Sequence, residues 1–286
     1  MDKMKNKRLF LLDMDGTLYL DDRLFPGAAE FLAKIQKSGG KYLFLTNNSS
    51  KGVDAYVEKM IRLGVPATAE DFLTSIDALI VFLERTYGAA VKKKKMYVVG
   101  TRSFRAQLAA AGFLLTETPD DDTEILILGF DRELTYRKLE DACRLLMRGV
   151  QEARTSGDAK AAAGLPAVDY YATNPDWVCP TAFGSVPDCG SMAWMLEKAT
   201  GRLPKFIGKP EPEMALLAME QTGFCASETL LIGDRLYTDI ACGNRAGVDT
   251  AFVLSGEGTL ADLAKGQGKP TYIFENITEV CKAVFG

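Results

Sequence analysis

The sequence of 286 residues contains no histidine. This absence excludes Ser-His-Asp and Cys-His nucleophile systems, phosphohistidine chemistry, and zinc or iron sites with imidazole ligands. Any catalytic chemistry must therefore use carboxylates, hydroxyls, lysine and a hard metal ion.

Other features are also missing. The six cysteines form no CxxC pair, which argues against a zinc site or a disulfide framework. The apolar run near the N-terminus, Leu9 to Leu12, is too short for a signal peptide or a membrane span, so we expect a cytoplasmic protein without a membrane partner. Acids outnumber bases by 38 to 34, and this balance does not predict the basic face that a nucleic-acid polymer needs.

What is present is an alternation of two patterns. Short apolar runs that end in a turn or a polar residue recur at 9–13, 42–46, 96–100, 125–129, 229–234, 250–255 and 271–275. Helical spacing lies between them, as in the series Ala28, Phe31, Leu32 and Ile35. Another helix is predicted from near Pro212 to Gly223. Strands that alternate with helices predict an α/β fold with parallel sheets.

The chemically interesting residues lie toward the two ends of the chain, roughly at 9–50 and 205–255. The middle has its own strand and helix patterns but no comparable acid cluster. We therefore expect residues 1–76 and 205–286 to form one discontinuous core domain and residues 77–204 to form an inserted domain.

Two carboxylates follow the first predicted strand. Asp13 and Asp15 stand two residues apart, directly before Gly16, and should emerge at the carboxyl edge of a sheet. Acids this close repel each other unless a cation or a proton intervenes, and Mg²⁺ is the hard cation that also bridges to phosphate. The alternative is an ordinary Asp-Gly turn with solvated acids.

Two further segments supply groups that could hold phosphate. Thr46, Asn47 and Asn48 follow the predicted strand at 42–46, and their hydroxyl, amides and backbone N–H groups suit phosphate oxygens. Lys209 stands between a glycine and a proline, before a predicted helix, where its ammonium could neutralise a phosphoryl group. Each segment also has an ordinary interpretation when it is taken singly. The residues of the first are common in turns, and the lysine of the second could simply lie on the surface.

A fourth segment adds two more acids after the strand at 229–234. Asp234 stands where this strand ends, and Asp239 opens the next helix. Asp239 could lie beside a metal ion, or it could simply cap the helix, and the sequence leaves both interpretations open. Complementary polar groups at four strand ends nevertheless predict one shared site.

These motifs resemble the haloacid dehalogenase superfamily, and more closely its NagD-like and p-nitrophenylphosphatase-like branch. The resemblance rests on DMDGTLY at 13–19, FLTNNSS at 44–50, YYATNPD at 170–176, ATGRLPKFIGKPEP at 199–212, LLIGDRLYTDI at 230–240 and VLSG at 253–256. It implies a Rossmann-like core with a parallel sheet and an inserted α/β cap domain. It also implies a phosphatase that hydrolyses small phosphomonoesters, such as sugar phosphates or nucleotides.

The resemblance assigns roles to the matching residues. Asp13 would be the nucleophile that forms an aspartyl-phosphate, and Asp15 would protonate the leaving alkoxide and then activate water. Thr46 and the Asn47 backbone would orient the phosphoryl oxygens, while Lys209 would stabilise their charge and Asp13.

The resemblance likewise implies a Mg²⁺ cofactor. Asp13, the main-chain carbonyl of Asp15 and Asp234 would hold the ion, with Asp239 in support. Two rivals remain open: a phosphotransferase or mutase on the same core, and a non-catalytic protein that binds phosphate.

Candidate substrate contacts also come from the predicted cap and its approach. Asn48, Asn174 and Asp176 lie in matching motifs, whereas the chain departs from the family after Asp176 because it lacks a histidine found there in some relatives. Trp177 could stack on a planar leaving group or pack between core and cap. The expected partner is a small phosphorylated metabolite, and relatives suggest a homodimer through the cap.

Overall fold

The chain folds into two units, each with its own parallel sheet. The computed structural model describes residues 2–148, 167–181, 183–266 and 268–286. The first unit comprises Met1–Asn47, Val53–Ala78 and Gly208–Gly286. The second comprises Asn48–Gly52 and Leu79–Ile207.

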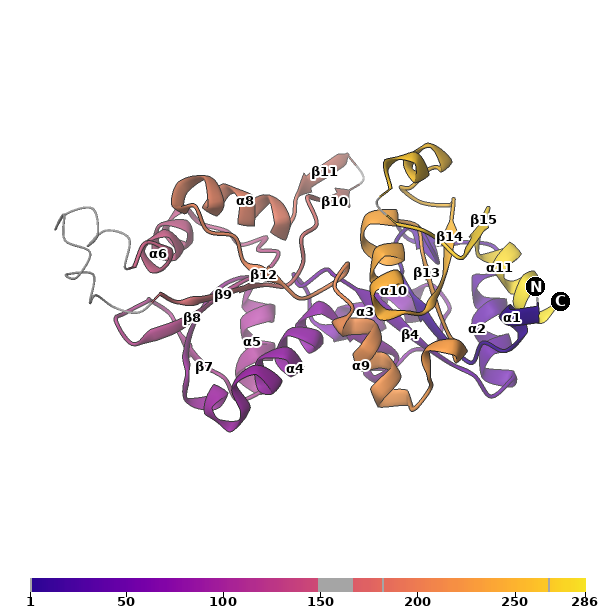
Figure 1. Cartoon of the computed structure of the whole chain (residues 1–286), viewed down its shortest axis with the longest axis horizontal. Coiled ribbons are helices and arrows are strands. Elements are labelled where there is room, and N and C mark those ends of the chain that lie inside the picture. The colour runs from indigo at the N-terminus through magenta and orange to yellow at the C-terminus, as the bar shows by residue number, and fades with distance from the viewer. Residues whose placement is uncertain (1, 149–166, 182, 267) are drawn as a thin grey trace. The chain divides into compact units, whose positions relative to one another are not determined.

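The first unit is built on a six-stranded parallel sheet with the order β15-β14-β13-β1-β4-β5 (Figure 1). Its strands are β1 (Leu9–Leu12), β4 (Lys41–Thr46), β5 (Phe72–Thr74), β13 (Thr229–Gly233), β14 (Asp249–Val253) and β15 (Tyr272–Phe274). A separate antiparallel hairpin is formed by β2 (Tyr19–Leu20) and β3 (Arg23–Leu24). From β1 the chain order runs outward in both directions, so the topological switch point lies between β1 and β13.

Helices cover both faces of this sheet. They are α1 (Asp2–Lys5), α2 (Ala28–Lys37), α3 (Val53–Arg62), α9 (Glu213–Thr222), α10 (Ala241–Ala246) and α11 (Ile277–Phe285), with short turns η1 (Ala69–Asp71), η3 (Ala226–Glu228), η4 (Leu236–Ile240) and η5 (Leu260–Lys265). In Figure 1, α2 and α11 lie on one side of the strands and α9 and α10 on the other. The helix predicted to end at Gly223 does so, because this glycine takes a left-handed φ of 77°.

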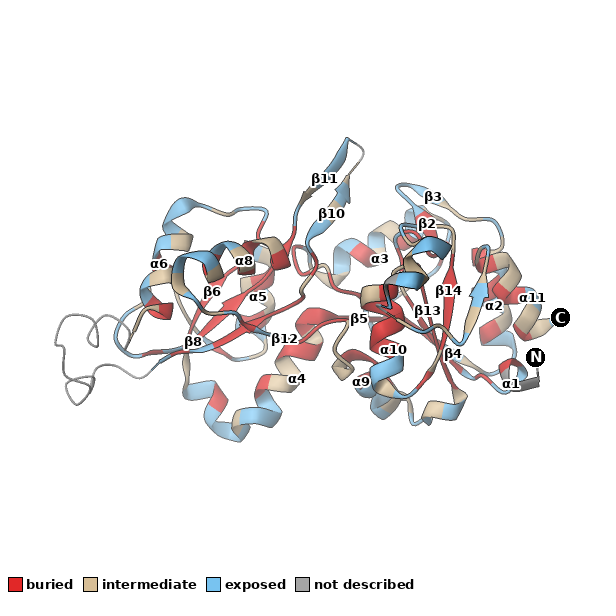
Figure 2. Cartoon of the chain, turned by 45° about the horizontal axis from the view of Figure 1, so that its top comes forward, coloured by how far each residue is buried: buried red, intermediate tan, exposed pale blue. Residues whose placement is uncertain are grey.

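The apolar spacing of α2 explains how this unit is held together. Phe31 from α2 and Phe10 from β1 are both fully buried, and their rings meet edge to face at 5.4 Å between centroids. Burial of each such side chain contributes about 1.5–3 kcal/mol. The central strands β1, β4 and β13 are buried almost throughout (Figure 2). A packed sheet of this kind is a rigid platform for side chains at its carboxyl edge.

The second unit has a five-stranded parallel sheet with the order β12-β9-β8-β6-β7. Its strands are β6 (Lys95–Val99), β7 (Leu114–Thr116), β8 (Thr123–Leu128), β9 (Asp169–Ala172) and β12 (Lys205–Phe206), with an antiparallel hairpin of β10 (Val178–Thr181) and β11 (Gly184–Pro187). Its helical elements are η2 (Gly88–Lys93), α5 (Arg102–Ala110), α6 (Tyr136–Leu146) and α8 (Cys189–Thr200), while α4 (Ser75–Tyr87) begins in the first unit and continues into the second.

The predicted fold class is confirmed, since both sheets are parallel and carry helices. In the ranges that the structure describes, every helix is too short or too polar to cross a membrane.

Candidate active site

Asp13 and Asp234 lie at the switch point of the first sheet. Strands β1 and β13 are parallel neighbours with Leu12 opposite Ile232, and the Asp13 N–H donates a hydrogen bond to the Ile232 carbonyl at 2.9 Å. Asp13 directly follows β1, and Asp234 directly follows β13. Two buried strands thus deliver two acids to the same point of the sheet edge, where open α/β folds bind ligands.

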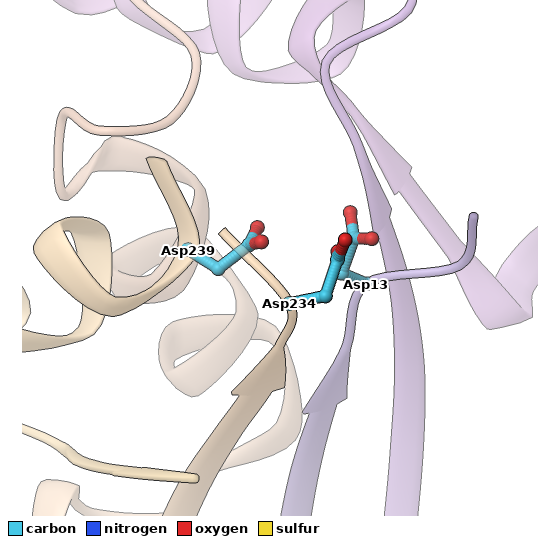
Figure 3. A group of neighbouring side chains, drawn as sticks. All are labelled: Asp13, Asp234 and Asp239. Carbon is cyan, nitrogen blue, oxygen red and sulfur yellow. The ribbon is translucent and has the colours of Figure 1, made fainter. Parts of the chain in front are cut away.

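A third acid, Asp239, joins this pair. One carboxylate oxygen from each of Asp13, Asp234 and Asp239 lies within 4.8 Å of the others. Figure 3 shows the carboxylates of Asp13 and Asp234 beside each other at the strand ends and that of Asp239 turned toward them. Asp234 and Asp239 are almost completely buried, so little solvent screens their repulsion.

Lys209 lies among these acids. Its ammonium Nζ is 2.6 Å from Asp13 Oδ1 and 2.6 Å from Asp239 Oδ1, and the residue is only 2% exposed. Burial by itself would lower the pKa of Lys209. The Asp13 and Asp239 carboxylates outweigh burial, so the pKa lies well above its usual range and the side chain stays charged.

One ammonium does not balance three carboxylates. Burial and the charge of Asp239 raise the pKa of Asp13 well above its usual value, although Lys209 opposes this shift. Burial and Asp239 also raise the pKa of Asp234, to about 6. A largely buried set of carboxylate oxygens with excess negative charge suits a hard divalent cation. The residues present therefore fit Mg²⁺.

Two glycines let the backbone approach Asp234 closely. Gly16 has a φ of 83°, and a Cβ built on it would lie 2.5 Å from Asp234 Oδ2, while a Cβ on Gly256 would lie 1.9 Å from the same atom. The Glu257 N–H donates a hydrogen bond to this oxygen at 2.7 Å, and the Thr17 hydroxyl donates to Asp234 Oδ1 at 3.4 Å. A larger residue in place of Gly16, directly after Asp15, would therefore collide with Asp234.

Asp15 lies apart from the three grouped carboxylates. Its side chain is 60% exposed, and Lys59 Nζ from α3 lies 3.5 Å from its Oδ1. The Tyr19 hydroxyl donates to Asp15 Oδ2 at 3.4 Å, and the Lys59 ammonium lies 3.9 Å from the centre of the Tyr19 ring. Sequence reasoning missed Lys59, because one lysine on a helix gives no signal until the helix is placed.

Both interpretations of Asp239 describe part of its environment. It lies in η4, a single π-helical turn, and its Oδ2 accepts a hydrogen bond from the Arg235 N–H at 3.1 Å. Its other oxygen pairs with Lys209. Asp239 therefore stabilises its own turn and also lies in the charged cluster. Single π-helical turns are frequent at functional sites.

Thr46 and Asn47 stand at the end of β4, next to β1 in the sheet, and both are 7% exposed. The side chain of Asn47 pairs with the backbone of Lys209: its amide N–H donates to the Lys209 carbonyl and its Oδ1 accepts from the Lys209 N–H, each at 2.8 Å. The Asn47 side-chain amide thus binds the backbone of Lys209. The expected contact of the Asn47 backbone with phosphate stays a prediction.

The four strand ends do not all belong to one sheet. The strand that precedes Lys209 is β12, which pairs with β9 in the second unit. Lys209 itself belongs to the first unit and lies three residues beyond the end of β12. It reaches the acids from a connecting segment, so its position depends on contacts such as those of Asn47.

The other candidate substrate contacts belong to the second unit. Asn48 Oδ1 accepts hydrogen bonds from the N–H and the hydroxyl of the residue two positions later, and Asn174 Oδ1 accepts from the Asp176 N–H at 3.0 Å. Trp177 is 52% exposed and stacks on Trp194 of α8, with 5.7 Å between ring centroids. Local hydrogen bonds hold the side chains of Asn48 and Asn174, and the stack holds that of Trp177. The role of these residues and of Asp176 in substrate binding stays a prediction.

The chain is similar in sequence to known protein families and to a curated relative. The family described as haloacid dehalogenase-like hydrolase matches residues 10–114, and a second, HAD-hydrolase-like family matches residues 206–280. The acid sugar phosphatase of Staphylococcus aureus strain USA300 is 31% identical over 277 residues, which are 96% of this chain and 97% of the relative.

Solved structures are similar over nearly the whole chain. A 4-nitrophenylphosphatase from Thermotoga maritima has a TM-score of 0.85 and 36% identity, with 99% of each chain covered. A putative NagD protein has a TM-score of 0.83 and 33% identity, covering 97% of this chain and 98% of its own. A glycerol phosphate phosphatase from Mycobacterium tuberculosis, in complex with magnesium, has a TM-score of 0.81 and 28% identity, covering 98% of this chain and 78% of its own.

The fold is of the α/β class, and its carboxylate cluster lies at the switch point of the first parallel sheet. The chain belongs to the haloacid dehalogenase-like hydrolase family. Its resemblance to the NagD-like and p-nitrophenylphosphatase-like branch is confirmed by the same relatives.

Proposed function

We propose that the protein is a Mg²⁺-dependent phosphatase that hydrolyses small phosphomonoesters through an aspartyl-phosphate intermediate. The observation that carries this proposal is the position of Asp13, at the end of β1 beside Asp234 and 2.6 Å from the Lys209 ammonium. The names of the relatives, which include sugar, glycerol and nitrophenyl phosphatases, support a small phosphate ester as the substrate.

In the first step, the Asp13 carboxylate attacks phosphorus. A bond forms between a carboxylate oxygen and phosphorus while the bond from phosphorus to the ester oxygen breaks. Asp15 gives its proton to the leaving alkoxide. The Lys209 ammonium neutralises charge on the phosphoryl oxygens, and Thr46 with the Asn47 backbone orients them.

In the second step, water attacks the aspartyl-phosphate. Asp15, now deprotonated, accepts a proton from the water, and the bond between Asp13 and phosphorus breaks. Inorganic phosphate leaves, and Asp13 returns as a carboxylate. The exposure of Asp15 suits this exchange of protons with substrate and water, whereas Lys209 is buried and stays charged.

Asp13, Asp234 and the main-chain carbonyl of Asp15 would hold Mg²⁺, with Asp239 in support. The bound ion would neutralise phosphoryl oxygens as charge develops on them. Hydrogen bonds to both carboxylate oxygens of Asp234 hold this side chain in place, which supports the proposed role.

The direct test of the proposal is release of inorganic phosphate from p-nitrophenyl phosphate with Mg²⁺ and with EDTA. Turnover should require Mg²⁺ and should be lost in Asp13→Asn, while circular dichroism shows an unchanged fold. Normal turnover by a folded Asp13→Asn enzyme would overturn the assignment of the nucleophile.

The same assay separates the rival reactions. A phosphotransferase or mutase would release alcohol without an equal amount of inorganic phosphate, because the phosphoryl group passes to a second hydroxyl. A non-catalytic protein would bind phosphate but turn over none of a panel of sugar phosphates, nucleotides, pyridoxal phosphate and glycerol phosphate. This panel also identifies the preferred ester.

The proposal extends to the organisation of the chain. Residues 77–204 would be a cap domain inserted into a core of residues 1–76 and 205–286, with Asn48, Asn174, Asp176 and Trp177 contributing to substrate binding. A homodimer through the cap is expected from the family resemblance, and light scattering of the purified protein tests it.

A further inference from the structure

The side chain of Asn47 contacts the backbone of Lys209. Its carboxamide forms two hydrogen bonds, both of 2.8 Å, with the N–H and the carbonyl of Lys209. Asn47 is 7% exposed and Lys209 is 2% exposed, so both bonds are shielded from water. Shielding makes such bonds stronger than exposed ones and makes their loss more costly.

Asn47 is itself held from a second direction. The Ser75 hydroxyl, at the start of α4, donates a hydrogen bond to the Asn47 carbonyl at 2.8 Å in a buried environment. Strand β4, which ends one residue before Asn47, is hydrogen-bonded to β1. The carboxamide is therefore presented to Lys209 from a rigid part of the sheet.

Lys209 needs such an anchor because it does not belong to the sheet that carries the acids. It follows Gly208, which restrains the backbone less than any other residue. Asparagine suits this contact because a single short side chain offers a donor and an acceptor together. Aspartate would lack the donor and leucine would lack both.

We propose that Asn47 is a positioning residue that fixes the Lys209 backbone so that the ammonium reaches Asp13 and Asp239. This inference rests on the proposed phosphatase function and extends it. Asn47 acts through Lys209, and the effect of its loss must therefore depend on the presence of the lysine ammonium.

The chain contains a matched control. Asn244, in α10, makes the same pair of hydrogen bonds with the backbone of Lys269, at 2.9 Å each, in an exposed part of the first unit. Asn47→Ala should lower kcat for p-nitrophenyl phosphate by roughly 10- to 100-fold, as expected when a catalytic group is displaced by about 1 Å. The KM should change much less, and Asn244→Ala should keep the kcat and KM of the wild type.

A double-mutant cycle with Lys209→Met separates positioning from a general loss of structure. Once the ammonium is absent, Asn47→Ala should lower the residual kcat by less than about twofold, since the two changes remove the same function. An equal loss of kcat with and without the ammonium would overturn the inference. If Asn47→Ala does not fold, Asn47→Leu, which fills a similar volume without hydrogen bonds, takes its place in the cycle.

Hydrogen exchange distinguishes failure of this inference from failure of the proposed function. The Lys209 amide should exchange faster in Asn47→Ala than in the wild type, while the Leu11 amide within β1 stays equally protected. An inactive wild type with this exchange pattern would reject the phosphatase function but retain the anchoring of Lys209. Unchanged exchange of the Lys209 amide would overturn the inference.

Discussion

The Lys209 ammonium lies 2.6 Å from Asp13 Oδ1, although 196 positions separate the two residues in the chain. Asp13 is the proposed nucleophile. Among the described residues, Lys209 is the only cation that pairs with two of the three grouped carboxylates. Because that cation balances only part of the negative charge, the site has a strong electrostatic preference for a further cation.

This charge imbalance predicts a pH-dependent effect of Mg²⁺ on stability. Burial and Asp239 raise the pKa of Asp234 from 3.8 to about 6, so the metal-free folded state holds a proton more tightly than the unfolded state. Without metal, folding stability must therefore fall as the pH rises through this interval. Bound Mg²⁺ requires deprotonated carboxylates, so its stabilising effect should grow over the same interval.

Calorimetry measures this effect. At a Mg²⁺ concentration about 100 times its dissociation constant, stabilisation should be about 2.7 kcal/mol, and the shift in Tm at a fixed Mg²⁺ concentration should be larger at about pH 7.5 than at about pH 5. Asp234→Asn should abolish most of the shift. An equal shift at both pH values would contradict binding by these acids.

Gly16 and Gly64 provide a matched pair for testing the close approach to Asp234. Their φ angles are 83° and 82°, but a Cβ at Gly16 would meet Asp234 at 2.5 Å, whereas one at Gly64 would meet nothing within 4 Å. Each substitution by alanine should cost about 1 kcal/mol of backbone strain. Urea unfolding should show a larger total loss of stability for Gly16→Ala, because its Cβ also meets Asp234. Only Gly16→Ala should also lower kcat, by roughly tenfold or more, because it displaces Asp234. Equal kcat values for the two variants would show that this approach is irrelevant to catalysis.

Lys59 should help to orient Asp15. In Lys59→Met the side chain of Asp15 loses its ion pair at 3.5 Å, so kcat should fall by a few-fold, well below the roughly 100-fold or more that general acid–base catalysis contributes. Lys34→Met is the control, because Lys34 forms an exposed ion pair with Glu30 at 2.8 Å on α2. Both variants should keep nearly the stability of the wild type, because exposed ion pairs contribute little to folding. If steady-state kinetics give the two variants the same kcat, Lys59 has no role in orienting Asp15.

Much of the fold could be predicted from the sequence because its signals are local. The apolar run at Leu9–Leu12 forms β1, and the spacing of Phe31, Leu32 and Ile35 forms α2, as expected. The membership of β12 was harder to predict. Its two residues pair with β9, and a strand this short carries too little pattern to show which sheet it joins.

Part of the candidate site could also be predicted from the sequence, and part could not. Asp13 and Asp234 follow buried strands, so their convergence could be expected from the rule for switch points in α/β sheets. The contacts of Asn47 with Lys209 and of Lys59 with Asp15 join segments far apart in the sequence, and no local pattern encodes them. The double role of Asp239 also depends on the placement of Lys209, so the sequence could not decide between its two interpretations.

Trapping of the covalent intermediate would show whether Asp13 is the nucleophile. In Asp15→Asn the base for the second step is absent, so p-nitrophenyl phosphate, whose leaving group needs little protonation, should give a burst of nitrophenol and leave the enzyme phosphorylated. Acid quenching followed by peptide mass spectrometry should then place the phosphoryl group on Asp13. A phosphoryl group on any other residue, or a burst without a phosphorylated peptide, would rule out an aspartyl-phosphate on Asp13.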